Sequence, residues 1–271
     1  MHDCERPLVV RLASLRAAQT TMQKPTVKVF STLEELSWAA AARFEEFARI
    51  HTVKKKGFSV ALSGGLTPKL LYQILASQTF AGRIRGERVH LFQVDERCVP
   101  PDHPQSNYGM IRETLLSRVP IPHANVHRMA AEQEDREEAC RQYAAELARV
   151  LKPEEGELPR LNMVLLGMGP DGHTASLFPG SEALDEQVLW VRPNYLEKLK
   201  MHRLTLTLPV LNAAAEVAFL IAGADKAQTL RQVLEGAPGQ LPAQKVQPVK
   251  GNVTWFVDEA AARLLRPETR G

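Results

Sequence analysis

Short apolar runs recur along the chain, and each ends in Gly, Pro or charged residues. Unbroken apolar runs such as 161–166 and 217–222 are typical of strands that are buried on both faces of a parallel sheet, whereas 89–94 and 203–208 alternate between apolar and polar residues, as strands also do. We predict strands over residues 27–30, 58–62, 89–94, 125–129, 161–166, 188–191, 203–208, 217–222 and 253–257. Of these, the segment 125–129 is expected to be an edge strand or a connector.

Helical signals lie between these runs. Ser31 and Glu34 have the spacing of a capping box and predict a helix that extends through residue 50. Thr67 is a good N-cap and Pro68 suits the first helical position, so a second helix is expected to begin there. Further helices are predicted over residues 108–118, 135–151 and 258–265. Two more are expected after Pro209 as far as residue 214, and after the loop 223–226 as far as residue 235.

The alternation of strands and helices defines the fold class. It predicts an α/β protein with an open, mostly parallel, Rossmann-like sheet that is flanked by helices and joined by right-handed crossovers. No internal repeat or linker divides the chain, so we expect a single domain over residues 27–271. Residues 1–26 fit the pattern poorly and are interpreted as an N-terminal extension, in which Met22 is an alternative start. The apolar stretch in this extension is too short and too interrupted by arginine for a secretory signal.

Composition narrows the choice of partners. The 271 residues are 44% apolar and 24% charged, with a formal net charge of +3, as in an ordinary globular protein. The basic residues form no stripe with interleaved aromatics, so nucleic acid is not expected as a partner, and the lysines 54–56 are interpreted as a solvated segment. Cys4, Cys98 and Cys140 lack metal-ligand spacing and suggest a reducing compartment. No apolar run approaches the roughly 20 residues that span a bilayer, so we expect a cytoplasmic protein without a membrane partner.

Polar loops follow four of the predicted strands, at residues 63–67, 95–97, 167–176 and 223–226. Ligands of open α/β sheets bind outside the carboxyl ends of the strands, so these loops are expected to converge on one pocket. That pocket would combine an anion-binding loop, an arginine, a lysine, and a histidine beside an aspartate. Such a set suits a small phosphorylated substrate and either proton transfer or water activation.

The loop 167–176 carries the candidate chemistry. Its glycines surround Pro170 and leave Asp171 and His173 as its only titratable side chains. Asp171 could hold the imidazole of His173 in one tautomer, as in a catalytic base, or it could cap a helix that begins near Thr174. Spacing alone leaves both interpretations open.

The segment Ser63-Gly64-Gly65 links a predicted strand to a predicted helix. This arrangement presents backbone N–H groups and the positive end of a helix dipole to an anion, although a plain tight turn would have the same sequence. If the loop binds phosphate, Gly64→Val is expected to raise the Michaelis constant for a phosphorylated substrate.

Three other polar residues are considered for the site, and Arg97 has two competing interpretations. Arg97 could hold a phosphate or an oxyanion, or it could form an ion pair with Asp95 or Glu96. Cys98 has no partner base adjacent in sequence and is interpreted as a bystander, and His127 as a packed or hydrogen-bonded histidine. The chain contains no Gly-x-Gly-x-x-Gly dinucleotide fingerprint, no Walker sequence and no His-Glu-x-x-His motif.

Three motifs resemble those of the 6-phosphogluconolactonase family, part of the larger glucosamine-6-phosphate isomerase and ribose-5-phosphate isomerase superfamily. They are GMGPDGHTASLFP at 167–179, VDER with DHPQSNY within 94–108, and RLTLTLPVLN at 203–212. The first is close to diagnostic, and the similarity extends from about Val27 to Leu265. The family usually has serine where this chain has Leu66, so the backbone of that loop, and not a hydroxyl, is expected to contact the ligand.

The resemblance implies a fold of the superfamily's isomerase type and hydrolysis of the δ-lactone of 6-phosphogluconate in the oxidative pentose phosphate pathway, with no cofactor and no metal. His173 would be the base that activates water and Asp171 would orient it, while Arg97 or backbone N–H groups would stabilise the oxyanion. The protein would act on a small phosphorylated sugar lactone, as a monomer or a homodimer. The residues expected to bind the substrate and its phosphate are Ser63, Gly64, Gly65, Thr67, Asp95, Arg97, Gly169, Arg203 and Lys226.

Two rival functions remain open. Glucosamine-6-phosphate deaminases carry an Asn-Glu pair four and five residues after the histidine, where this chain has Leu177 and Phe178, and a tyrosine in place of Arg97. A non-catalytic sugar-phosphate sensor would need an N-terminal DNA-binding unit, and about 24 residues before Val27 are too few for a helix-turn-helix. The presence of both Asp171 and His173 favours an enzyme.

Overall fold

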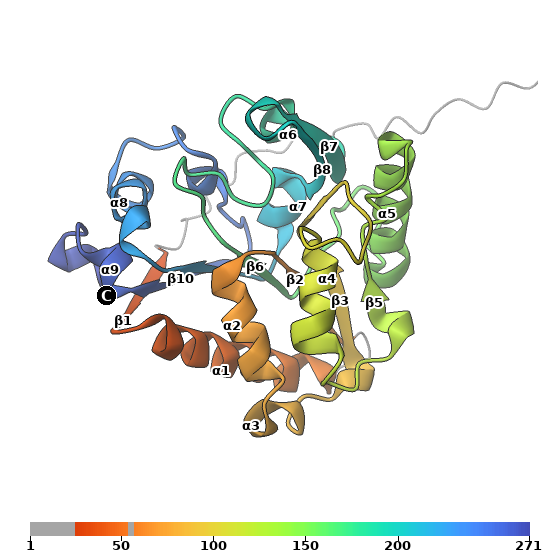
Figure 1. Ribbon diagram of the computed structural model, residues 1–271, viewed down its shortest axis with the longest axis horizontal. Helices are drawn as coiled ribbons and strands as arrows, with labels where there is room; N and C mark the ends of the chain where they lie inside the picture. Colours follow the sequence, from red (N-terminus) through yellow and green to blue (C-terminus); the bar gives the residue numbers. More distant parts are fainter. Residues whose placement is uncertain (1–24, 54–56) are drawn as a thin grey trace, which may run out of the picture.

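Seven parallel strands form the central sheet of the computed structural model, which describes residues 25–53 and 57–271. The strands are β1 (Thr26–Phe30), β2 (Phe58–Leu62), β3 (Val89–Gln93), β5 (Val126–His127), β6 (Met163–Leu166), β9 (Glu216–Ile221) and β10 (Asn252–Asp258). Their order in the sheet is β1-β10-β9-β6-β2-β3-β5, and every neighbouring pair is parallel. Helices cover the sheet on both sides (Figure 1), so the predicted α/β class is confirmed.

Most of the helices pack against the two faces of this sheet. The helices are α1 (Leu33–Thr52), α2 (Leu66–Leu75), α3 (Gln78–Ala81), α4 (Asn107–Ile111), α5 (Arg136–Leu151), α6 (Glu182–Asp185), α7 (Leu208–Ala213), α8 (Ala227–Glu235) and α9 (Glu259–Ala262). Of these, α6 lies beside residues 191–196. The predicted helix 108–118 is present as α4 followed by a π-helical turn over Arg112–Leu116.

Two apolar clusters fill the space between the sheet and its helices. Successive side chains of a strand point to opposite faces, and β9 shows this directly. Phe219 belongs to the cluster that includes residues of α5, α7, α8 and α9, whereas Leu220 belongs to the cluster that includes residues of α1, α2 and α3. Both faces of the strands are therefore buried, which explains why the predicted strands are continuous apolar runs.

A second, three-stranded antiparallel sheet was not predicted. It consists of β4 (Asp95–Arg97), β8 (Met201–Leu206) and β7 (Val191–Leu196), in that order. The chain leaves β3 through Val94, whose carbonyl accepts a hydrogen bond from the N–H of Leu206 at 2.8 Å. The charged segment at the end of β3 is thus itself a strand, and it belongs to the small sheet.

The direction of chain progression reverses between β2 and β6. From β2 the chain proceeds to β3 and β5 on one side, whereas β6, β9 and β10 follow one another on the other side. Such a reversal separates the loops that leave the two strands and opens a crevice at their carboxyl ends. The loops that follow β2 and β6 begin at Ser63 and Gly167, which places two of the four predicted site loops on either side of this crevice.

The starts of two helices differ from the prediction. The N-cap of α1 is Thr32, whose hydroxyl accepts the N–H of Glu35 at 3.1 Å, while the N–H of Ser31 donates to the Glu35 carboxylate at 3.1 Å. The capping pair is therefore shifted by one residue. Helix α2 begins at Leu66 and not at Pro68, and its N-cap is Gly65 instead of Thr67, because Gly65 adopts a φ of 107° that turns the chain into the helix earlier.

Two predictions around the central loop are wrong. No helix begins near Thr174, because residues 174–177 fold into a turn that is closed by a β-bridge between Thr174 and Leu177. The predicted strand 188–191 is also absent, and β7 begins only at Val191. There the N–H groups of Val188 and Leu189 donate to the Glu186 carboxylate at 2.7 and 3.0 Å instead of joining a sheet.

Some expectations concern residues outside the described part of the chain. These are the interpretation of residues 1–24, including Met22 as a start and the position of Cys4, and the interpretation of the lysines 54–56. No helix of the described residues is long and apolar enough to cross a bilayer.

Candidate active site

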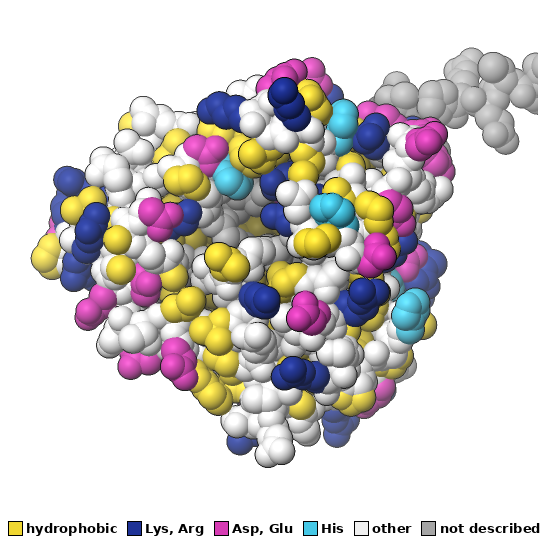
Figure 2. Space-filling model, viewed as in Figure 1, with side chains coloured by type: hydrophobic (Ala, Val, Ile, Leu, Met, Phe, Trp, Pro, Cys, Tyr) yellow, Lys and Arg dark blue, Asp and Glu magenta, His cyan; other side chains and the backbone are white. Residues whose placement is uncertain are grey.

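The four predicted loops line a single cavity of about 570 Å³ at the carboxyl edge of the large sheet. Figure 2 shows the hollow in this face, with basic and histidine side chains at its margin. Of the residues predicted to form the site, ten line the cavity: Ser63, Gly64, Gly65, Thr67, Asp95, Arg97, Gly169, His173, Arg203 and Lys226. Asp171 does not line it but contacts His173.

Asp171 holds the imidazole of His173 at its Nδ1 atom. Nδ1 of His173 lies 2.5 Å from Oδ1 of Asp171, and the same oxygen accepts the backbone N–H of His173 at 3.2 Å. A carboxylate partner favours the tautomer that carries its proton on Nδ1, which leaves Nε2 as the basic nitrogen. In the described part of the chain Nε2 has no hydrogen-bond partner, and the ring lines the cavity. This is the geometry of a positioned base.

The charge of Asp171 is stabilised by the same contact. Burial alone would raise the pKa of this carboxyl, but the hydrogen bond and the charge of His173 outweigh burial, and its pKa lies below the usual value. Asp171 therefore remains ionised at neutral pH, as is required of a group that stabilises an imidazolium.

Gly169 makes room for the imidazole. A Cβ atom at this position would lie 2.1 Å from Nδ1 and from Cε1 of His173, far inside van der Waals contact. The carbonyl of His173 also accepts the N–H of Gly169 at 2.9 Å, so the loop folds back on itself at this point. The glycine requirement thus arises from close approach and not from an unusual φ.

The loop after β2 lies beside a buried amide. A Cβ atom on Gly64 would fall 1.7 Å from Oδ1 of Asn107, so only glycine fits there. The hydroxyl of Tyr72 donates to the carbonyl of Ser63 at 2.7 Å and fixes the start of the loop. Behind this loop, α2 directs its first N–H groups toward the cavity, which is the arrangement that attracts an anion.

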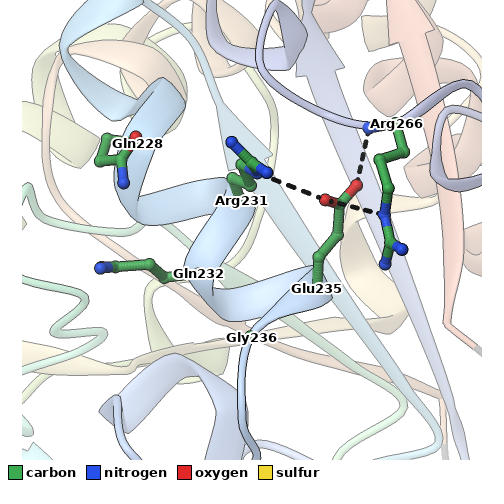
Figure 3. A pocket seen from close by; sticks show the side chains of 6 residues that line it. All are labelled: Gln228, Arg231, Gln232, Glu235, Gly236 and Arg266. Atoms are coloured by element: carbon green, nitrogen blue, oxygen red, sulfur yellow. Dashed lines mark hydrogen bonds and ion pairs between the residues drawn. The ribbon is translucent and has the colours of Figure 1, made fainter.

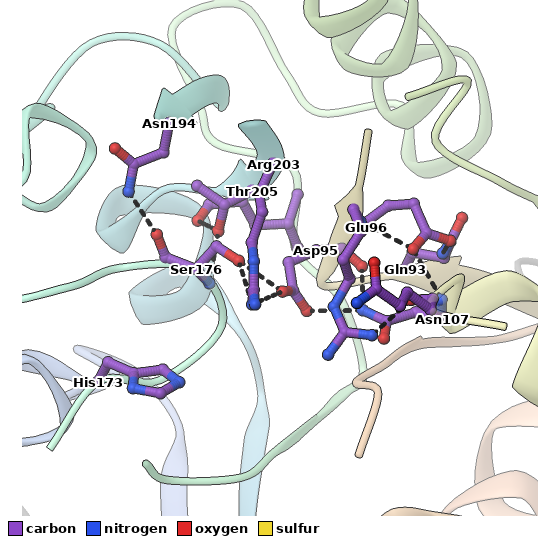
Figure 4. A network of polar contacts seen from close by, with 12 residues as sticks. Gln93, Asp95, Glu96, Asn107, His173, Ser176, Asn194, Arg203 and Thr205 are labelled. Atoms are coloured by element: carbon purple, nitrogen blue, oxygen red, sulfur yellow. Dashed lines mark hydrogen bonds and ion pairs between the residues drawn. The ribbon is translucent and has the colours of Figure 1, made fainter. Parts of the chain in front are cut away.

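A network of buried polar contacts joins the loops of the site (Figure 4), and Asp95 is at its centre. The hydroxyl of Ser176 donates to Asp95 at 2.6 Å, and the Asn107 amide donates to its carbonyl and its carboxylate at 2.9 and 3.3 Å. Nη1 of Arg203 lies 3.9 Å from the same carboxylate and donates to the Ser176 hydroxyl at 3.4 Å. Burial lowers the pKa of Arg203, and the charge of Asp95 acts in the opposite direction.

Ser176 fixes the His173 loop to the small sheet. Its N–H donates to the Thr205 hydroxyl at 3.2 Å and its carbonyl accepts the Asn194 amide at 2.8 Å. Sequence reasoning did not assign Ser176, Asn107, Asn194 or Thr205 to the site. Three of them, Asn107, Ser176 and Thr205, lie within the motifs on which the family resemblance was based, and this was the available signal.

Glu96 and Arg97 hold the loop that precedes α4. The buried Glu96 carboxylate accepts the N–H groups of Asn107 and Tyr108, both at 2.7 Å, at the N-terminus of that helix. Nη1 of Arg97 donates to the carbonyl of Gln105 at 2.6 Å, and within the described residues Arg97 forms no ion pair with Asp95 or Glu96. The ion-pair interpretation of Arg97 is therefore wrong.

Several buried polar atoms of the cavity wall have no hydrogen-bond partner within the protein. Four of the six such side-chain atoms in the described chain belong to cavity residues, namely Ser63 Oγ, Arg97 Nε, Asn107 Oδ1 and Arg203 Nε. Burying such groups unpaired is unfavourable, and their concentration in one wall is typical of a binding site. Lys226 adds a cation at the opposite loop, where its Nζ lies 2.9 Å from Asp225.

The interpretation of His127 is confirmed, and that of Cys98 as a bystander stays a prediction. Burial raises the pKa of the Cys98 thiol, which disfavours the reactive thiolate. His127 is buried and contacts Glu146 and His90, as expected for a hydrogen-bonded histidine. The described residues contain no group of three or more His, Cys, Asp or Glu side chains that could hold a metal ion.

A second hollow, of about 330 Å³, lies beside α8 (Figure 3). Its charged groups are already paired: the Glu235 carboxylate accepts the N–H of Arg266 at 2.7 Å and lies 3.2 and 3.6 Å from the side-chain Nε atoms of Arg266 and Arg231. This hollow ties the C-terminal segment to α8, and none of the predicted site residues lines it.

The parallel sheet, the cavity at its switch point with Arg97, Arg203 and Lys226 in its wall, and the carboxylate-oriented histidine define an α/β protein whose site suits a small anionic ligand and proton transfer. The chain belongs to the glucosamine-6-phosphate isomerases/6-phosphogluconolactonase family, whose model matches residues 31–255.

Relatives and solved structures agree with this assignment. The 6-phosphogluconolactonase of Synechocystis sp. is 42% identical over 77% of this chain and 85% of its own length. The human 6-phosphogluconolactonase is 41% identical over 88% and 93% of the two chains. The structure of 6-phosphogluconolactonase from Trypanosoma brucei superposes with a TM-score of 0.80 at 29% identity, covering 91% of this chain and 100% of that one.

Proposed function

We propose that this protein hydrolyses 6-phospho-D-glucono-1,5-lactone to 6-phosphogluconate, a reaction of the oxidative pentose phosphate pathway. Two relatives named 6-phosphogluconolactonase are 42% and 41% identical to the chain over most of its length. The structural observation that carries the proposal is the pairing of His173 with Asp171 at the wall of a cationic cavity. Residues 27–271 form the catalytic domain in this proposal.

In the proposed reaction His173 acts as a general base. Its Nε2 takes a proton from water while the water oxygen attacks the lactone carbonyl, and a base positioned in this way is typically worth 10²–10⁴-fold in rate. The tetrahedral intermediate then expels the ring oxygen, which receives the proton from the imidazolium. Asp171 holds the tautomer and stabilises the imidazolium, and Arg97 or backbone N–H groups of the glycine loops stabilise the oxyanion.

The phosphate of the substrate is bound away from the carbonyl. The loop Ser63–Gly65, the N-terminus of α2, Arg203 and Lys226 are the groups proposed to hold it, since they supply backbone N–H donors and two cations from three separate elements. Thr67, Asp95 and Gly169 complete the proposed substrate site. The reaction uses only water and protein groups, and we expect the enzyme to act in the cytoplasm as a monomer or a homodimer.

The deciding assay is acid release from freshly made 6-phosphogluconolactone, corrected for spontaneous hydrolysis. We expect turnover well above the spontaneous rate, with no ammonia release from glucosamine 6-phosphate under the same conditions. Ammonia release without lactone hydrolysis would favour the deaminase, and binding of the sugar phosphate with neither reaction would favour the sensor.

The phosphate loop is tested with Gly64→Val. A side chain at Gly64 must displace the Asn107 amide, because the Cβ position lies 1.7 Å from its Oδ1. We expect a Michaelis constant raised by about 10-fold or more, as a misplaced binding loop weakens substrate binding. Gly82→Val is the control, since nothing lies within 4 Å of a Cβ atom at Gly82. An unchanged Michaelis constant in Gly64→Val would refute the assigned phosphate loop.

A further inference from the structure

The ring of Phe178 stacks on the candidate base. Its centroid lies 4.0 Å from that of the His173 imidazole, with 20° between the ring planes. On the same ring, the guanidinium carbon of Arg203 lies 5.7 Å from the centroid. One aromatic side chain thus contacts both the proposed base and a proposed phosphate ligand.

Phe178 is not part of the hydrophobic core. It is only partly buried and belongs to neither of the two apolar clusters that pack against the sheet. It does not line the cavity either, so it lies outside the substrate site. Core packing and direct substrate contact therefore do not explain this ring.

The backbone of Phe178 is fixed independently of its ring. Its N–H donates to the Ser181 hydroxyl at 3.2 Å, and its carbonyl accepts the N–H of Ser181 at 3.1 Å. Ser181 is the N-cap residue of α6, and the preceding residue, Leu177, is fully buried. The ring is therefore presented to His173 from a closed turn.

We propose that Phe178 is a positioning residue that sets the plane of the His173 imidazole and thereby the direction of its Nε2. The inference rests on the proposed lactone hydrolysis. Three contacts fix the orientation of the His173 imidazole. They are the hydrogen bond from its Nδ1 to Asp171, the close approach of Gly169 to its Cε1 edge, and the stack of Phe178 on one face. A hydrogen bond at one atom still allows the ring to tilt about that atom, whereas the stack opposes this tilt.

The aromatic face also suits the charge that the reaction creates. Ring faces carry negative electrostatic potential and attract cations. When His173 takes a proton it becomes an imidazolium, and Phe178 then contacts both this new cation and the guanidinium of Arg203. The ring attracts each of the two cations, which an aliphatic side chain at this position does not do.

The test compares Phe178→Leu with Phe178→Tyr in the full-length protein. Phe178→Leu is expected to lower kcat about 10-fold with a Michaelis constant within about twofold of wild type, because a misdirected base slows the chemical step but not binding. Phe178→Tyr keeps the ring and is expected to retain kcat within about twofold. Phe178→Met serves the same purpose as the leucine variant if that variant does not fold.

A matched control is Tyr195→Leu. The Tyr195 ring also contacts a histidine, with its centroid 4.6 Å from that of His202 and 44° between the ring planes, but neither residue lines the cavity. Its kcat should equal that of wild type. Thermal unfolding of each variant separates positioning from stability, since a merely structural role would lower the melting temperature and leave kcat per folded molecule unchanged.

The outcomes are distinguishable from failure of the proposed function. If the wild-type protein does not hydrolyse the lactone, the proposed function is wrong, and this inference is wrong as well. If wild type is active, then unchanged kcat in the folded leucine or methionine variant overturns the positioning role. A loss of kcat that Phe178→Tyr shares in full also overturns it, because the ring would then not be the cause.

Discussion

Two histidines of this protein form nearly identical pairs with a carboxylate, yet only one of them is placed to act as a base. Nδ1 of His173 lies 2.5 Å from Asp171, and Nδ1 of His127 lies 2.6 Å from Glu146. The difference lies at the other nitrogen. Nε2 of His127 lies 3.0 Å from Nδ1 of His90, whereas Nε2 of His173 has no hydrogen-bond partner among the described residues.

The surroundings of the two pairs differ in the same sense. His127 is buried at the edge of the large sheet, where its ring stacks on Phe92 with 4.5 Å between centroids. His173 stands at the cavity wall on a loop that leaves the centre of the sheet. A carboxylate–histidine pair therefore does not identify a base, and an unused second nitrogen that faces a cavity is the informative feature.

Replacing each histidine by glutamine should give the largest contrast. In His173→Gln, loss of the base is expected to reduce kcat by roughly 10²–10⁴-fold with folding intact. In His127→Gln, kcat per folded molecule should match wild type. The measurement is steady-state lactone hydrolysis with folded protein quantified by circular dichroism, and near-wild-type turnover in His173→Gln would exclude it as the base.

Replacing the two carboxylates should give a smaller contrast of the same kind. Asp171→Asn removes the carboxylate charge that stabilises the imidazolium and introduces an NH2 donor that favours the wrong tautomer of His173, and it is expected to lower kcat on the order of 10²-fold. Glu146→Gln should leave kcat unchanged, because its histidine is remote from the cavity. Equal kcat values for the two variants would contradict the assigned roles.

Two glycines of the central loop test how closely the base is packed. Gly169→Ala places a Cβ atom 2.1 Å from the His173 ring and is expected to lower kcat about 10-fold by displacing it. Gly167→Ala adds the same methyl group to the same loop, but nothing lies within 4 Å of that position. The kcat values of the two variants should therefore differ from each other, and similar losses of kcat would indicate a general effect on the loop.

The buried histidine pair should be visible as acid sensitivity of the fold. Burial lowers the pKa values of both His90 and His127, with the hydrogen bond of Glu146 opposing it at His127. The unfolded chain therefore takes up protons first as the pH falls below about 6.5, and the free energy of unfolding decreases.

Urea unfolding at pH 7 and pH 5 measures this effect. The free energy of unfolding should fall from pH 7 to pH 5, and solvent screening of the half-buried His90 keeps this loss small. The loss should be smaller in the variant His90→Gln/His127→Gln. The hydrogen bond that Arg149 donates to Glu146, together with that from His127, outweighs burial and holds the pKa of Glu146 at about 2. The contribution of Glu146 to the free energy of unfolding is therefore lost only at more acidic pH. Equal losses in wild type and variant would contradict the assignment.

The sequence predicted the large sheet because its strands are apolar on both faces and its loops are polar. The convergence of four loops followed from one rule about the carboxyl ends of parallel strands, and the cavity residues from His173 to Lys226 were found in this way. These features depend on local composition and on order along the chain.

What was missed depends on contacts between distant segments. The hydrogen bond from Ser176 to Asp95 joins residues 81 positions apart, and no local pattern indicates it. The antiparallel sheet has the same origin, since strand-forming alternation at residues 203–208 does not reveal which strand lies beside it. Near Thr174 the local signal for a helix was misleading, because Leu177 turns back and is buried.

The unpaired polar atoms of the cavity wall have a consequence for evolution and engineering. Ser63 Oγ, Asn107 Oδ1 and the Nε atoms of Arg97 and Arg203 weaken the fold wherever no ligand compensates them. An apolar replacement of Ser63, whose hydroxyl has no hydrogen-bond partner within the protein, would be a direct route to a more heat-resistant protein, and it would remove part of the binding surface. Natural selection for catalysis therefore sets an upper limit on how robust this region can become.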